Sequence, residues 1–282
     1  MKEVFWDSKK CRLKKNELFM EIIQLLVLSV TQGVTEFLPV SSSAHLILIS
    51  QLFGWKDQGM VIDTMAHLGS LFAFFLYICF NRPEDYTDNG FFQFSETVFD
   101  TQLVKKIVIA TTPAIIIGLL FRDVIADYAR NAEIISITTI FFAIVLFIAD
   151  QKRGAKKINE LSYKEAFLIG LAQSIALIPG VSRSGITLAA GLFFGFSRVD
   201  ALKFAVLLSI PVIILASFSE LGAFLVTVPK FDLIDLIFVF TVSMLSAYFC
   251  LILLFKFITQ IGLLPFVIYR IVLGCLIFIF LV

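Results

Sequence analysis

The chain has 282 residues, of which 59% are hydrophobic and 16% are charged, and its formal net charge is +1. About a quarter of the residues of a soluble globular domain are charged. The composition therefore excludes that class and indicates an all-α, polytopic integral membrane protein. A net charge so close to zero says nothing in favour of a nucleic-acid partner, and we expect none.

A polar and basic arm, residues 1–19, precedes the first apolar segment. No small-residue cleavage site follows it, so an interfacial arm is expected rather than a cleaved signal peptide. Met20 is an alternative start of the chain. Residues 20–282 are expected to form a single membrane domain.

Six apolar segments approach the roughly 20 residues that a membrane-spanning helix needs. They are residues 60–80, 104–121, 133–149, 201–219, 233–258 and 263–282. Four shorter apolar segments form two pairs, 20–31 with 46–55 and 165–178 with 186–196.

Each short pair is interrupted by proline and small polar residues, at Pro39 in the first and at Pro179-Gly180 in the second. Proline breaks the helical hydrogen-bond ladder. Broken backbone at membrane depth is tolerated where it is buried in protein or lines a wet cavity. Each pair is therefore predicted to be a re-entrant helix–loop–helix.

The two pairs form a weak internal repeat. Gln32 and Gln173 precede the two prolines by similar distances, and serine-rich runs follow each proline. Three predicted spans lie between the pairs, so the second pair enters from the opposite side and the repeats are inverted. The first repeat covers about residues 20–122, the second about 163–258, and a final helix follows at 263–282. Matching interrupted segments in two halves indicate a site at their interface.

The orientation follows from the basic residues between spans. Residues 151–162 contain Lys152, Arg153, Lys156 and Lys157, which favours a cytoplasmic position for this loop. With six spans, both termini then face outside. The basic N-terminal arm argues for the opposite orientation, but we give the short internal loop more weight.

The second polar cluster, Pro179 to Thr187, is suited to binding an anion. A helix N-terminus offers free N–H groups, and the guanidinium of Arg183 matches phosphate oxygens. Ser182, Ser184 and Thr187 can donate to the same anion. The alternative is an interfacial arginine flanked by serine caps.

The first polar cluster, Gln32 to His45, supplies acid, hydroxyl and imidazole groups. Glu36 can bind a divalent cation or act as a base, and Gln32 lies one helical turn before it. Ser41, Ser42 and Ser43 are hydroxyl donors or nucleophiles. His45 can transfer a proton or attack phosphorus, although a packing role is the commoner one for a single histidine. His67 is a third buried polar candidate, for which lining the site and a helix–helix hydrogen bond are equally plausible.

The segments QGVTEFLPVSSSAH and PGVSRSGIT together resemble the two signature segments of the bacterial undecaprenyl-diphosphate phosphatase family, the BacA type linked with bacitracin resistance. The resemblance extends from about Ile22 to the C-terminal segment Leu264–Arg270. It implies removal of one phosphate from undecaprenyl diphosphate, which returns the lipid carrier to peptidoglycan and other wall-polymer synthesis. It also implies the cytoplasmic (inner) membrane, a site that opens to the outer side, and a divalent cation, Mg²⁺ or Ca²⁺.

The resemblance assigns roles to individual residues. The resemblance implies that Glu36 binds the cation and that Gln32 is a weak ligand. The family pattern allows Glu or Gln at position 32, and the neutral amide is the weaker ligand. The family's serine pair and histidine fall on Ser41, Ser42 and His45. The phosphate-binding group is expected to be Ser41, Ser182, Arg183, Ser184 and Thr187.

The expected reaction is phosphoanhydride cleavage with Glu36, Ser42, His45 and Arg183 as the catalytic group. Ser42 and His45 are not ranked as nucleophiles. The expected partners are a polyprenyl diphosphate and membrane lipid, and a homodimer is left open. The alternative function is a polyprenyl-phosphate transporter or flippase, since inverted repeats with broken helices are typical of transporters.

Overall fold

The computed structural model describes residues 20–55, 59–80, 100–121, 124, 131–152, 154–224 and 232–282. The basic arm predicted at 1–19 lies outside these residues. The described chain is all-α and contains no strand, only an isolated bridge between Lys156 and Phe196. This confirms the predicted fold class.

Six helices are long and apolar enough to cross a membrane, and they coincide with the six predicted spans. They are α3 (Met60–Phe80), α5 (Thr101–Leu120), α7 (Ala132–Asp150), α10 (Arg198–Phe224), α11 (Leu233–Ile261) and α12 (Leu264–Leu281). Side-chain caps define some of their starts: the carboxylate of Asp100 accepts from the Gln102 N–H at 3.0 Å. The chain is a multi-pass membrane protein.

The short apolar segments form the two predicted helix pairs. The first is the helix Met20–Thr35 with α2 (Ser42–Leu52), and the second is α8 (Tyr163–Ser174) with α9 (Arg183–Phe193). A 3₁₀ turn, η3 (Ile175–Leu177), follows α8. The second helix of each pair begins three or four residues earlier than its apolar segment, with a serine, Ser41 or Ser182, at the N-cap position.

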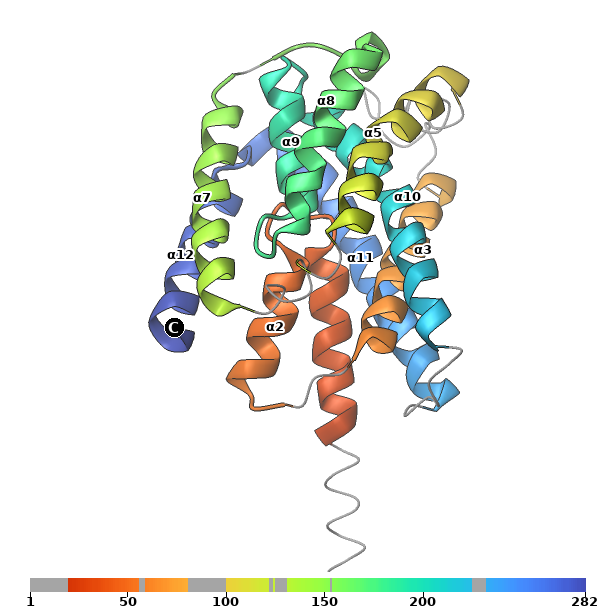
Figure 1. The fold of residues 1–282 in the computed structure, drawn as a ribbon, viewed down its shortest axis with the longest axis vertical. Coiled ribbons are helices and arrows are strands. Elements are labelled where there is room, and N and C mark those ends of the chain that lie inside the picture. The colour runs from red at the N-terminus through yellow and green to blue at the C-terminus, as the bar shows by residue number, and fades with distance from the viewer. Residues whose placement is uncertain are drawn as a thin grey trace, which may run out of the picture.

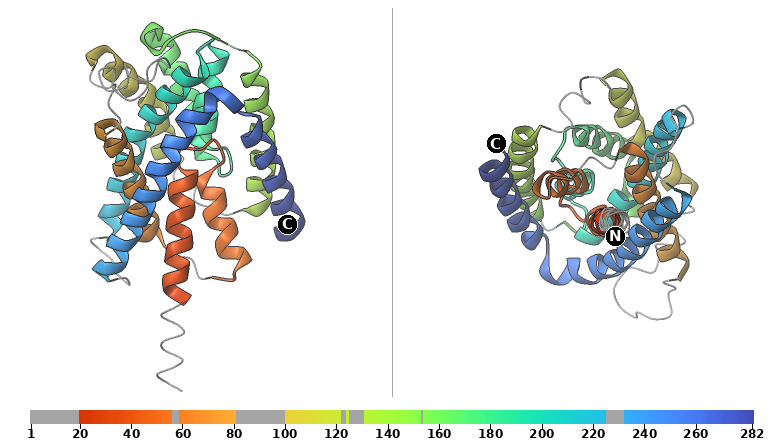
Figure 2. Two further views of the ribbon diagram at one scale, coloured as in Figure 1. Left: turned by 180° about the vertical axis from the view of Figure 1, so that it is seen from behind. Right: turned by 90° about the horizontal axis from the view of Figure 1, so that it is seen from below.

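The two pairs extend from opposite ends of the molecule, and their connecting loops meet near mid-height (Figure 1). The view from behind shows the same meeting of the loops, with the long helices around them (Figure 2). This opposed arrangement is the one that inverted repeats require. Re-entry of each pair into a bilayer stays a prediction.

Helices from different parts of the chain pack closely. The main contacts pair α11 with α3, α5 with α8, α12 with α7, and α10 with α9. Glycine permits the closest approach: a Cβ at Gly69 of α3 would lie 2.3 Å from the Phe240 carbonyl oxygen of α11.

The end of the molecule that carries residues 151–162 is tied by an ion pair. At this end α7 finishes and α10 begins, and Arg198 donates from Nε to Asp150 at 2.5 Å and from Nη2 at 2.9 Å. A short 3₁₀ helix, η2 (Ile158–Glu160), lies between α7 and α8. Two of the basic residues used for the orientation, Lys156 and Lys157, lie near this ion pair, and the Lys156 N–H donates to the Gly195 carbonyl at 2.9 Å.

Candidate active site

The two central loops have matching backbone geometry. Ser41 and Ser182, which lie 141 positions apart, are the only non-glycine residues with positive φ in the described chain, at 72° and 68°. Each is the N-cap of the helix that follows, α2 or α9. Residues other than glycine rarely adopt this backbone conformation unless the surroundings impose it. The repeat inferred from sequence is therefore also a repeat of local structure.

Glu36 lies at the centre of the site. Its carboxylate accepts from the guanidinium of Arg183, which brings the two loops into direct contact. The same carboxylate accepts from Gln32 Nε2 and, at 3.2 Å, from Ser42 Oγ. His67 Nδ1 of α3 lies 3.1 Å from Glu36 Oε2. A second link between the loops is the hydroxyl of Ser184, which donates to a carbonyl of the first loop at 2.8 Å.

A small polar cavity of about 170 Å³ lies between the loops. Its walls combine one carboxylate, one guanidinium, one imidazole and several hydroxyls: Glu36, Ser41, Ser42, Ser43, His67, Ala176, Ser182, Arg183 and Ser184. Six of the predicted site residues, namely Glu36, Ser41, Ser42, Ser182, Arg183 and Ser184, thus meet at one place.

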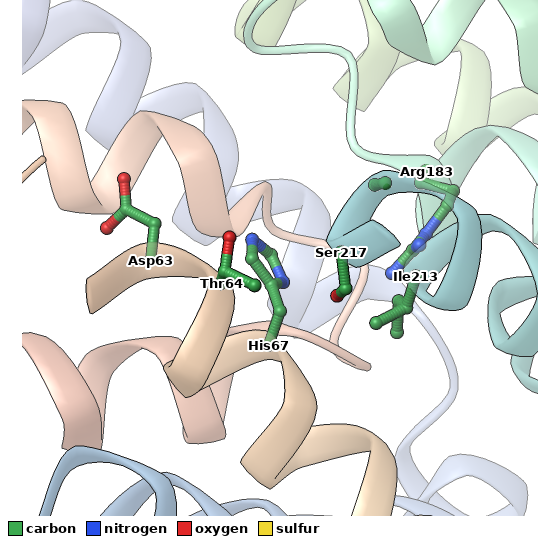
Figure 3. Close-up of a pocket in the computed structure, with 7 residues that line it drawn as sticks. Asp63, Thr64, His67, Arg183, Ile213 and Ser217 are labelled. Carbon is green, nitrogen blue, oxygen red and sulfur yellow. The ribbon is translucent and has the colours of Figure 1, made fainter. Parts of the chain in front are cut away.

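An adjoining cavity of about 250 Å³ shares His67 and Arg183 with the first. Figure 3 shows His67 rising from α3 and Arg183 descending from the start of α9 toward this space, with Ser217 of α10 beside them. Asp63 and Thr64 line it near the start of α3. The two cavities together lie between the two central loops, α3 and α10.

Three predicted site residues line neither cavity: Gln32, which donates to Glu36, and the two described next, His45 and Thr187. His45 Nδ1 lies 2.7 Å from the Ser41 carbonyl oxygen, and Nε2 lies 2.5 Å from the Tyr269 hydroxyl. The His45 and Tyr269 rings stack, 5.5 Å apart and 2° from parallel. Thr187 donates within its own helix to the Arg183 carbonyl at 2.8 Å. Direct contact of either residue with substrate stays a prediction.

Comparison with known proteins identifies the family. The family model described as bacitracin resistance protein BacA matches residues 25–276. The chain belongs to the BacA family.

Several relatives cover almost the whole of this BacA-family chain. A protein of Campylobacter curvus named undecaprenyl-diphosphatase is 44% identical over 265 residues, which are 93% of this chain and 100% of the relative. A Campylobacter concisus protein of the same name is 45% identical over 90% of this chain and 97% of its own. Undecaprenyl-diphosphatase 1 of Pseudoalteromonas translucida is 43% identical over 93% of this chain and 99% of its own length.

The predicted cation has few ligands in this BacA-family site. The described residues contain no group of three or more His, Cys, Asp or Glu side chains suited to a metal ion. Glu36 supplies one carboxylate, and the buried carbonyl oxygen of the Gln32 amide has no hydrogen-bond partner. Mg²⁺ is commonly held by one or two carboxylates together with substrate phosphates and water. The residues therefore fit a cation whose coordination the substrate completes.

Sequence reasoning missed Tyr269 and Arg270 of α12 as neighbours of the site. Both stand in the Leu264–Arg270 segment that carried part of the resemblance, and a tyrosine and an arginine inside an apolar helix were the available signal. His67 was recognised, but its position against Glu36 depends on how α3 packs.

Proposed function

We propose that this protein hydrolyses undecaprenyl diphosphate to undecaprenyl phosphate and inorganic phosphate, and so recycles the lipid carrier of cell-wall synthesis. The observation that carries the proposal is the pairing of Arg183 with Glu36 in a hydroxyl-lined cavity. The names of the relatives point to the same reaction.

Arg183 is the group that binds the diphosphate. Its Nη2 rests on Glu36, and its Nε is buried without a hydrogen-bond partner. Phosphate oxygens satisfy a guanidinium better than a single carboxylate contact does, because they accept from two donors at once. Ser182 and Ser184 add donors on the same loop, and together these groups stabilise the charge of the transferring phosphoryl group.

Ser42 is the nucleophile that the geometry favours. Its Oγ lies 3.2 Å from Glu36 Oε2, a distance at which the carboxylate can take the hydroxyl proton as Oγ bonds to the terminal phosphorus. The bond from that phosphorus to the bridging oxygen breaks, undecaprenyl phosphate leaves, and water then releases phosphate from the serine. His45 is the weaker candidate, because both of its ring nitrogens are engaged away from the cavity.

A divalent cation held by Glu36 and Gln32 would neutralise phosphate charge and orient the diphosphate. The chain's own residues bind and orient the substrate and receive the serine proton.

The prenyl chain has an apolar groove available. A cavity of about 400 Å³ runs along α11 and reaches Leu38, two residues after Glu36. Its other walls include Phe249, Leu253 and Phe257. We assign the isoprene units next to the diphosphate to this groove.

The site faces the outer side of the cytoplasmic membrane in this proposal. Asp63, near the start of α3, and Ser217, in the second half of α10, line the cavity, whereas residues 154–162 lie against the start of α10, where the Ile158 N–H donates to Asp200. A cytoplasmic position for the basic loop therefore places the cavity toward the outside.

The test is release of inorganic phosphate by purified protein from undecaprenyl diphosphate in detergent, with and without a chelator. Arg183→Ala should abolish release, while Arg198→Ala, which removes an arginine at the opposite end, should retain it. Near-normal release by Arg183→Ala would refute the assignment. Lipid-phosphate movement in proteoliposomes without hydrolysis would instead support the transporter alternative.

A further inference from the structure

Arg270 is the largest fully buried side chain of the described protein, with 0% exposure. Its guanidinium donates only to backbone carbonyls. Nη1 donates to Pro39 at 3.2 Å, Nη2 to Gly180 and Val181 at 3.0 Å each, and Nε to Thr139 of α7 at 3.3 Å. One side chain thus joins both central loops and α7.

Two of these acceptors are equivalent in the repeat. Gly180 lies 141 positions after Pro39, the same offset that relates Ser182 to Ser41. The bonded carbonyls of Pro39 and Gly180 therefore each lie two residues before a serine with positive φ. Such conformations persist where the surroundings over-determine them, and Arg270 is the group that contacts both stretches of backbone.

The hydrogen bonds that the Arg270 guanidinium donates all go to these carbonyls. In the described part of the chain it forms no ion pair with a carboxylate, and it does not line the polar cavity. A planar guanidinium can donate in several fixed directions at once, whereas a lysine ammonium is a compact point charge on a flexible stem. The arrangement needs arginine because its acceptors lie on three separate elements.

We propose that Arg270 is a positioning residue that sets the separation of the two halves of the active site. Glu36 lies three residues before Pro39, and Arg183 lies two residues after Val181. A change in the spacing of the bonded carbonyls therefore moves Glu36 and Arg183 relative to each other. The preceding residue, Tyr269, contacts the imidazole of His45 in α2 at 2.5 Å, so α12 contacts the first helix pair at two points.

This inference rests on the proposed phosphatase function and is tested in the same assay. Misplacement of reacting groups by about 1 Å can cost on the order of 10²-fold in rate. We expect Arg270→Lys to lower kcat by about that factor while KM changes by less than about threefold, because the phosphate-binding side chains remain present.

Two further variants make the test specific. Val267→Ala removes a buried side chain one turn earlier on α12 and should lower the melting temperature at least as much as Arg270→Lys with near-wild-type kcat. Gly185→Ala keeps the arginine but would place a Cβ 2.9 Å from Arg270 Nη1 and 3.1 Å from Ser182 Oγ. It should reproduce the fall in kcat even if Arg270→Lys does not fold.

The outcomes separate the two claims. No phosphate release by the wild-type protein contradicts the proposed function. With an active wild type, a kcat within threefold of normal in folded Arg270→Lys or Gly185→Ala overturns the positioning role. The positioning role is also overturned if Val267→Ala has the same melting temperature as Arg270→Lys and loses as much kcat. The effect would then be one of stability alone.

Discussion

Arg183 and Glu36 are separated by 147 positions in the chain, and their side chains form an ion pair where the two loops meet. Only 1% of the Glu36 side chain is exposed. A buried carboxylate is costly unless it is paired and hydrogen-bonded. Glu36 in the first repeat therefore depends on the guanidinium of Arg183 in the second. Neither repeat has a complete site by itself.

Glu36→Gln should reduce both activity and stability. The substitution leaves Arg183 partly buried without its anionic partner, and breaking a buried pair typically costs about 3–5 kcal/mol. We expect at least about 10²-fold slower phosphate release, because the group that receives the serine proton is lost. Release and thermal unfolding should be measured together.

Glu165→Gln is the matched control for that substitution. Glu165 pairs with Lys156 at 2.5 Å near the protein surface, and such pairs contribute about 0–1 kcal/mol. Phosphate release by the Glu165→Gln protein should equal that of the wild type. A Glu36→Gln protein as active as this control would rule out the central role of Glu36.

Ser42→Ala should remove the covalent step. Its hydroxyl is the one that donates to Glu36, whereas Ser43 Oγ lies 3.3 Å from Ser41 Oγ, so Ser43→Ala should lose less activity. Rapid-quench mass spectrometry of the wild-type protein should find phosphate on Ser42. An acid-labile phosphate on the His45 peptide would show that histidine attacks instead.

Gln32→Glu should strengthen cation binding. The substitution places a second carboxylate beside Glu36, which is the single carboxylate among the predicted cation ligands. Affinity for hard cations rises with the charge of the ligands. The cation concentration that gives half-maximal thermal stabilisation should fall about tenfold. Gln102→Glu on exposed α5 adds the same charge elsewhere, and an equal shift in both variants would argue against a cation at Gln32.

Gly69→Ala should weaken the contact between α3 and α11. The added Cβ would lie 2.3 Å from a backbone carbonyl of α11, and overpacking typically costs about 1–3 kcal/mol. Gly118→Ala on α5 meets only a leucine methyl at 3.7 Å, so it should be neutral or stabilising by up to about 1 kcal/mol. Thermal unfolding in detergent distinguishes the two, and equal melting temperatures would contradict the close approach.

The six spans and most of the site could be predicted because their signals are local. Long apolar runs identify helices that cross a bilayer, and a carboxylate or guanidinium within such runs is costly enough to indicate function. Glu36 and Arg183 were recognised on this ground, and Ser42 was recognised as a hydroxyl in the same polar cluster and through the family resemblance. The orientation of His45 was not, because an imidazole beside a serine run has the same sequence whether it faces the cavity or Tyr269.

The sequence by itself determined the fold class, the broken helix pairs and the residue types of the site, because these depend on hydrophobicity and on backbone chemistry close along the chain. Only the tertiary structure decided which side chains meet. Glu36 lies against Arg183 and His67, and Arg270 bridges carbonyls of both loops, because helices distant in the chain pack side by side. Such contacts depend on how entire helices pack against one another. The residue spacing within each of the two polar loops does not specify them.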